Sequence, residues 1–243
     1  MKNEHSKFIH KLQNLFLNLF APRNCVGCQK INEVLCKNCL NSSYKFGGAC
    51  VFCNFRNNTG KICQQCLPVR SGIDRMLWVG EYKNALKNAI QELKYKKRKE
   101  LTKPLAELLY KKFREYYPKY KMENFRVIPI PMHPQKEQAR GFNQAKLLAK
   151  EFGKISNIEV LSDFLLKTEN TLSQVETKTK EERMKNLEGA FKKAPLLNKE
   201  GVMRGKTIIL IDDVATTGAT FLHASRALGD EVKIICLAIA HGY

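Results

Sequence analysis

The sequence predicts an α/β protein in which a small cysteine-rich module precedes a parallel sheet. From residue 126 onward, short apolar segments alternate with amphipathic helical segments. The apolar segments lack an in–out alternation, which is typical of parallel strands buried on both faces. Eight of the nine cysteines lie within residues 25–66, a stretch with turn signals and few long periodic segments. No apolar run approaches the ~20 residues that a membrane-spanning helix needs.

Three parts follow one another along the 243 residues. They are an amphipathic helix (1–21), the cysteine-rich module (22–70) and the α/β domain (71–243, with a basic helical part 71–125 and a core 126–243). Within the domain, strands are expected at residues 76–82, 126–131, 158–166, 207–211 and 231–240. Helices are expected at residues 85–93, 104–116, 136–152 and 218–228. A charged stretch, 167–188, has no steady apolar face and is expected to be a loop or a solvated helix.

Residues 5–20 carry an apolar stripe at helical spacing, and Pro22 ends the pattern. Packing of this stripe against the cysteine-rich module is favoured, because most amphipathic helices bury their stripe within their own protein. A membrane surface is the alternative, since Lys2, Lys7 and Lys11 flank the stripe.

Charge is distributed unevenly. The chain has 42 Lys and Arg against 23 Asp and Glu, a net charge of +19. The first 125 residues hold 24 of these basic and 9 of these acidic residues, so +15 of the total lies there. Such a field attracts polyanions or anionic lipid surfaces, and it carries no information about the fold.

Four Cys-x-x-Cys pairs make up the cysteine-rich module. They are Cys25/Cys28, Cys36/Cys39, Cys50/Cys53 and Cys63/Cys66. Two such pairs surround one tetrahedral ion, so eight thiolates predict two structural Zn²⁺ sites with no open position for a substrate. Consecutive pairs form the simplest sites, and an interleaved arrangement also fits the spacing. Redox chemistry and iron–sulfur ligation fit the pattern less well. Since the stretch from Phe8 to Phe20 has no secretory cleavage site, a reducing, cytoplasmic setting is expected.

The segment Thr207–Thr220 reads TIILIDDVATTGAT. A buried strand brings Asp212 and Asp213 to its carboxyl end, where open α/β sheets bind ligands. The following turn and helix start offer backbone N–H groups and threonine hydroxyls to an anion. Carboxylates beside an anion site fit a sugar phosphate, whose ribose hydroxyls donate to the acids while the turn holds the phosphate.

This segment resembles the phosphoribosyl-pyrophosphate (PRPP) signature of type I phosphoribosyltransferases. The resemblance implies that Asp212 and Asp213 hold the ribose hydroxyls and that the turn wraps the 5′-phosphate. The implied turn residues are Ala215, Thr216, Thr217, Gly218, Ala219 and Thr220. It also implies Mg²⁺ with the pyrophosphate, a pyrophosphate-facing loop after Pro131, and a mobile catalytic loop at 167–188. The candidates in that loop are Thr168, Gln174, Arg183 and Asn186.

Three further segments narrow the resemblance: RGFNQA at 140–145, Arg183-x-x-Asn186, and KYKKR at 94–98. Together with the cysteine pairs and the PRPP motif, they are similar to the ComF/ComFC family of competence proteins. The resemblance implies a factor for natural transformation that handles incoming single-stranded DNA. It also implies two further partners: a DNA-translocating competence ATPase and the inner face of the cytoplasmic membrane.

A basic segment with an interleaved aromatic residue suits single-stranded DNA, because cations track the phosphates while the ring stacks on a base. The candidates are Lys94, Tyr95, Lys96, Lys97, Arg98, Lys99 and Arg140. Arg140 suits either DNA or PRPP, and a solvated helix face is the alternative for the segment.

Two functions are therefore carried forward. The first is a DNA-uptake factor that binds single-stranded DNA and has a PRPP-binding domain. The second is an active phosphoribosyltransferase that transfers PRPP's ribose phosphate to a nucleobase or amine. No general base stands out, and His133 and His223 are expected to be structural.

Overall fold

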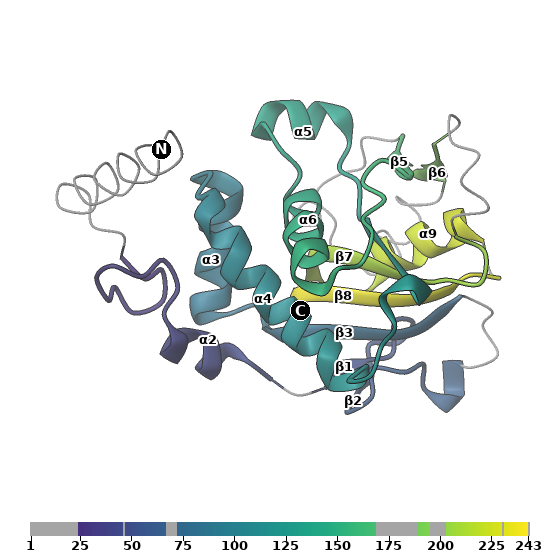
Figure 1. Ribbon diagram of the computed structural model, residues 1–243, viewed down its shortest axis with the longest axis horizontal. Helices are drawn as coiled ribbons and strands as arrows, with labels where there is room; N and C mark the ends of the chain where they lie inside the picture. Colours follow the sequence, from purple (N-terminus) through teal and green to yellow (C-terminus); the bar gives the residue numbers. More distant parts are fainter. Residues whose placement is uncertain are drawn as a thin grey trace, which may run out of the picture.

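The computed structural model describes residues 24–45, 47–66, 72–168, 189–194, 203–229 and 231–242. Its main sheet has the strand order β2-β1-β3-β8-β7-β4. The strands are β1 (Gly48–Ala49), β2 (Arg56–Asn57), β3 (Ile73–Glu81), β4 (Phe125–Pro129), β7 (Thr207–Ala215) and β8 (Lys233–His241). Strands β3, β8, β7 and β4 run parallel, and β1 and β2 add an antiparallel edge (Figure 1). The predicted α/β class is confirmed.

Helices and one short strand pair complete the described chain. The helices are α2 (Lys37–Ser43), α3 (Asn84–Tyr95), α4 (Thr102–Tyr116), α5 (Pro134–Arg140), α6 (Gln144–Ser156) and α9 (Ala219–Leu228). Three 3₁₀ turns are η1 (Gln64–Cys66), η2 (Lys99–Leu101) and η3 (Met122–Asn124). A second sheet pairs β5 (Leu165–Lys167) with β6 (Phe191–Lys193). No helix in these described ranges is long and apolar enough to cross a membrane.

The central strands bury both of their faces, which explains their unbroken apolar sequence. In β7, Ile209 and Ile211 join one hydrophobic cluster with residues of α3, α4 and α6. Ile208 and Leu210 point the other way and join a second cluster with residues of α9. Because successive side chains of a strand point to opposite faces, the two clusters lie on opposite sides of the sheet. Cys236, predicted as core, is fully buried in the second cluster.

The single helix predicted at 136–152 is wrong: two helices, α5 and α6, occupy this stretch. Gly141 ends α5 with a left-handed φ of 86°, a conformation that glycine adopts without strain. Asn143 then begins α6, because its side chain accepts hydrogen bonds from the backbone N–H groups of Ala145 (2.9 Å) and Lys146 (3.4 Å). In Figure 1, α5 lies above α6. Helix α5 and the last turn of α3 lie toward the same side of the sheet.

Two strand predictions also change. The strand expected at 158–166 is reduced to an isolated bridge between Val160 and Val127, followed by β5 in the second sheet. Strand β7, by contrast, runs four residues beyond its predicted end at 211, so both aspartates lie within it. Its backbone remains paired with β8, with Asp212 opposite Ala238 and Ala215 opposite His241.

Several predictions concern residues outside the described ranges. The amphipathic helix at 5–20 lies there, as do Gln174, Arg183 and Asn186 of the charged stretch. The predicted boundary near residue 70 stays a prediction; β1 and β2 from the cysteine-rich side are hydrogen-bonded into the main sheet.

Candidate functional site

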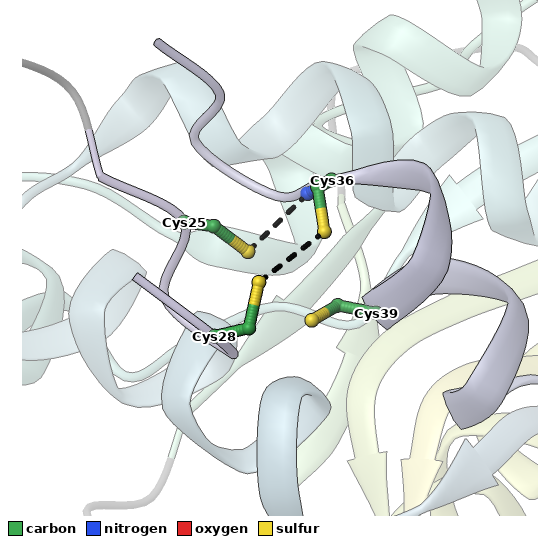
Figure 2. A group of neighbouring side chains, drawn as sticks. All are labelled: Cys25, Cys28, Cys36 and Cys39. Atoms are coloured by element: carbon green, nitrogen blue, oxygen red, sulfur yellow. Dashed lines mark hydrogen bonds between the residues drawn. The ribbon is translucent and has the colours of Figure 1, made fainter. Parts of the chain in front are cut away.

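The first cysteine tetrad joins the two cysteine pairs nearest the start of the chain. Cys25, Cys28, Cys36 and Cys39 turn their sulfur atoms toward one common point (Figure 2). The Sγ atoms of Cys28 and Cys36 lie 3.6 Å apart. The backbone N–H of Cys36 donates to the Cys25 Sγ at 3.3 Å. Two of the ligands come from a turn, and the other two lie at and just inside the start of α2.

The second tetrad consists of Cys50, Cys53, Cys63 and Cys66. The Sγ atoms of Cys53 and Cys63 are 3.5 Å apart. The first pair follows β1, and Cys66 ends the 3₁₀ turn η1. In each tetrad, all four sulfur atoms lie within 4.8 Å of one another. The arrangement of consecutive pairs is therefore the observed one.

Both tetrads fit a tetrahedral metal ion. Zinc–sulfur bonds of about 2.3 Å in tetrahedral geometry place neighbouring sulfur atoms about 3.8 Å apart. The sulfur spacings of 3.6 and 3.5 Å are close to that value. Four thiol donors fill the coordination sphere, so these sites suit a structural ion rather than a catalytic one.

Backbone donors prepare one thiol of each tetrad for metal binding. Burial raises the pKa of Cys25, but N–H groups of Cys36, Cys28 and Gly27 outweigh it and bring the pKa to about 6. The pKa of Cys50 falls to about 7 through the same balance. Since a metal binds the thiolate, these two cysteines offer the readiest first ligands.

A second candidate site lies at the carboxyl edge of the main sheet. Asp212 and Asp213 sit near the end of β7, and Asp213 is buried with 8% exposure. The Nζ of Lys94, from the last turn of α3, forms an ion pair with Asp213 Oδ2. The Asp212 side chain accepts a hydrogen bond of 2.8 Å from the Asp213 N–H.

Burial and neighbouring charges shift the pKa values of Asp212 and Lys94. Burial, followed by the neighbouring charge of Asp213, raises the pKa of Asp212 well above its ordinary value. Burial opposes the charge of Lys94, but the charge of Asp213 outweighs it and raises the pKa of Lys94. Like charges placed this closely carry a cost in the folded state, and such sites are often functional.

The turn after β7 lies at the same carboxyl edge of the sheet. Gly218 has a left-handed φ of 74° and precedes the first turn of α9. The Ala219 N–H lies 3.4 Å from the Thr217 hydroxyl, which accepts from it. With Ala215, Thr216 and Thr220, these residues form the strand–turn–helix junction that the sequence predicts, and a helix N-terminus of this kind favours anions.

The candidate DNA residues gather where the end of α3 meets the end of α5. Tyr95 is 70% exposed, and the Arg140 guanidinium lies 5.6 Å from its ring centroid. The Nζ of Lys99 lies 5.1 Å from the centroid of Phe142. Lys96 and Lys97 lie on the same segment, next to Tyr95.

Three of the predicted basic residues form ion pairs. Lys96 pairs with Glu92 and stays 70% exposed. Arg98 forms ion pairs with Glu92 and Glu100. The side chain of Lys94 is only 19% exposed and turns inward to Asp213. Lys94 thus belongs to the acidic edge, and the exposed basic surface consists of Tyr95, Lys96, Lys97, Lys99 and Arg140.

Sequence reasoning did not find Lys94 or Lys167 as members of the acidic edge. Burial lowers the pKa of Lys167, as does the charge of Lys136, whereas the charge of Asp212 raises it. Lys167 also lines a pocket of about 650 Å³ with Thr168 and His133. Only the tertiary fold brings these groups together, since they come from separate elements.

His133, His223 and Thr168 remain to be placed. His133 caps α5, where its Nδ1 accepts a hydrogen bond of 3.3 Å from the Gln135 N–H. His223 is buried within α9. Thr168 follows β5 and donates its N–H to the Ala190 carbonyl at 2.9 Å.

Fold and sites together define an α/β protein with two four-cysteine clusters that can each hold a metal ion, and an acidic pair beside a strand–turn–helix junction. No family model matches the chain. Among characterised proteins, it is 29% identical to Competence protein F of Haemophilus influenzae over 230 residues, 92% of this chain and 94% of the relative. It is 27% identical to Competence protein ComFC of Bacillus subtilis, covering 96% of this chain and 95% of the relative.

A further relative is the DNA utilization protein YhgH of Escherichia coli K12, 26% identical over 72% of this chain and 76% of the relative. These similarities extend over most of the chain, and they confirm the resemblance to the ComF/ComFC family.

Proposed function

We propose that this protein takes part in DNA uptake and utilization, binding single-stranded DNA and a phosphorylated ribose such as PRPP. The names of its relatives, competence proteins and DNA utilization proteins, support the general role. The observation that carries the DNA part is the exposed Tyr95 ring beside Arg140, within a group of lysines.

The exposed basic surface has the chemistry that a single strand requires. A base stacks on an aromatic face, and each such contact contributes roughly 1–3 kcal/mol. The surrounding ammonium groups neutralise phosphates, so affinity should fall steeply with salt. Arg140 already lies over the Tyr95 ring, and this contact keeps the ring at the junction of α3 and α5.

Fluorescence anisotropy with a labelled oligonucleotide tests this part. Tyr95→Ala should weaken binding about tenfold, from the loss of one stacked base. Arg140→Ala should weaken binding and flatten its salt dependence. Lys154→Ala removes an exposed charge from α6, away from this surface, and should change little. Absence of binding by the unaltered protein at low salt would refute the DNA part.

For PRPP, the support comes from Asp212, Asp213 and the turn 215–220. The carboxylates accept from ribose hydroxyls, and the turn and the N-terminus of α9 attract the phosphate. Lys94 offsets part of the acidic charge, which reduces repulsion of an anionic ligand. Mg²⁺ prefers oxygen donors, and these carboxylates and the ligand's phosphates supply them.

Zinc is the ion we propose for both tetrads, because four thiolates with tetrahedral spacing favour it. Elemental analysis of the purified protein should give two zinc ions per chain. Iron, or no metal in a folded protein, would contradict this assignment.

Phosphoribosyl transfer is a second candidate function. It is favoured by the pocket of about 650 Å³ that Lys167 shares, because Lys167 also interacts with the charge of Asp212. A pocket of this size accommodates a small planar acceptor. Release of pyrophosphate from PRPP with one of a panel of nucleobases or amines would establish the reaction, and its absence across the panel would remove this candidate.

The other proposed associations are a DNA-translocating ATPase and the cytoplasmic membrane surface. Both follow from the family resemblance and the net charge of +19. A pull-down against the purified ATPase and a vesicle-binding assay at two salt concentrations test them separately.

A further inference from the structure

The second tetrad touches the turn that we propose as the phosphate site. Val51 lies between Cys50 and Cys53, and its backbone packs directly against Gly218. A Cβ atom placed on Gly218 would lie 2.6 Å from the Val51 carbonyl oxygen and 2.9 Å from its Cγ2. There is thus no room for a side chain between the cysteine pair and the turn.

His241 makes a second connection between the same two parts. It is the last residue of β8 and is 1% exposed. Its Nε2 lies 2.8 Å from the Oδ1 of Asn54, the residue after Cys53. The backbone of Thr216 in the turn interacts electrostatically with the ring, and the N–H of the next residue, Gly242, donates to the Ala215 carbonyl at 2.9 Å. The Trp78 ring stacks on it at a centroid distance of 4.3 Å, which fixes its plane.

The conformation of Asn54 depends on the cysteine pair. Its φ is 65°, in the left-handed region, and its N–H donates to the Cys50 carbonyl at 2.8 Å. A loop this short keeps its shape when both of its thiolates bind one ion. Metal binding at Cys50 and Cys53 therefore fixes the position from which Asn54 contacts His241.

The first tetrad has a different neighbour. Its turn packs on α3, where the Asn88 side chain donates to the Val26 carbonyl at 2.9 Å. A Cβ on Gly27 would lie 2.8 Å from the Cβ of Ala85, also in α3. Both contacts are with α3, which is a different neighbour from the turn 215–220.

We propose that Val51, Asn54 and His241 position the turn 215–220, so that affinity for a sugar phosphate depends on the second tetrad and not on the first. This inference rests on the proposed role of the turn. The three are positioning residues: they contact the turn or one another and need not touch the ligand. A turn whose N–H groups are already oriented binds an anion more tightly, because little ordering remains to be done on binding.

Isothermal titration of the metal-loaded full chain with PRPP and Mg²⁺ tests the proposal. His241→Phe keeps the ring stacked on Trp78 but removes the hydrogen bond to Asn54 and the polar interaction with Thr216, and we expect about fivefold to thirtyfold weaker binding. Asn54→Ala removes only the hydrogen bond to His241 and should weaken binding about fivefold. The double variant should match His241→Phe alone, since both changes remove one shared contact. Asn88→Ala removes the equivalent single bond at the first tetrad and should leave affinity unchanged.

Three results separate the possible failures. If the unaltered protein binds PRPP and His241→Phe binds it equally well, the positioning role is wrong while the proposed function stands. If Asn88→Ala weakens binding as much as Asn54→Ala, the effect is general loss of stability, which also overturns the proposal. If the folded, metal-loaded protein shows no binding at all, the proposed function fails and this inference fails with it.

Discussion

The two cysteine tetrads have the same ligand set but different surroundings. The first belongs to the face of the sheet covered by α3, α4 and α6, where Cys25 and Cys36 join the hydrophobic cluster. The second follows strand β1, and its neighbours Ala49 and Val51 join the cluster on the opposite face. The same four-cysteine ligand set therefore has two different neighbours. The first tetrad fixes a loop to helix α3, and the second lies against the proposed phosphate site.

The largest expected effect comes from removing one ligand of each tetrad. Cys39→Ser and Cys66→Ser should each release one metal ion and lower stability by several kcal/mol, on the order of 3 kcal/mol or more. Only Cys66→Ser should also weaken PRPP binding, by about tenfold. Elemental analysis, circular dichroism and calorimetry check the three effects. Equal PRPP affinity in two folded variants would show that the tetrads do not differ in this way.

A smaller effect is expected from alanine at two glycines that share a left-handed backbone. Gly218 has a φ of 74° and Val51 in contact, whereas Gly205 has a φ of 68° and nothing within 4 Å of the place that a methyl group would take. Gly205→Ala should cost about 1 kcal/mol from backbone strain alone. Gly218→Ala should cost about 3 kcal/mol, because the methyl group also displaces Val51. Urea unfolding measures the free energy of unfolding of both variants. Equal losses would show that Val51 moves aside without a measurable loss of stability.

The smallest effect concerns pH and stability at the acidic edge. Because the pKa of Asp212 is raised in the folded state, its contribution to stability is lost as the pH rises through that folded value. Asp212→Asn lacks this titration, so it should be more stable than the unaltered protein at higher pH. The two stabilities should converge below about pH 4, where the acid is protonated in both states. Stability curves that stay parallel over the whole pH range would show that ionisation of Asp212 does not destabilise the folded protein.

Local patterns account for what the sequence predicted well. The strands without in–out alternation, the cysteine pairs and the Asp212–Asp213 segment are each defined by short stretches of sequence. Within such stretches, periodicity and residue spacing largely determine the local structure. The break at Gly141 was not predicted, although a glycine followed by Asn143 carries the signals of a helix end and a helix start. The length of the apolar run at 158–166 was misleading, since a short apolar run does not specify its partner strand.

Long-range contacts account for what the sequence did not predict. Asn54 and His241 are 187 positions apart, and neither residue carries a signal of the other. Lys94 looked like one more cation in a basic segment, and only the packing of α3 beside β7 turns it toward Asp213. A partial signal did exist for His241: it directly follows the strand predicted at 231–240, and the carboxyl ends of parallel strands meet at one edge.

The proposed function depends most on a phosphorylated ribose binding at the carboxyl edge of the sheet. Calorimetric titration of the zinc-loaded full chain with PRPP and Mg²⁺ measures this directly. We expect saturable binding of one PRPP per chain, abolished or strongly weakened by Asp212→Asn in a protein that remains folded. A folded, zinc-loaded protein that gives no binding heat and no PRPP-dependent rise in melting temperature would contradict it.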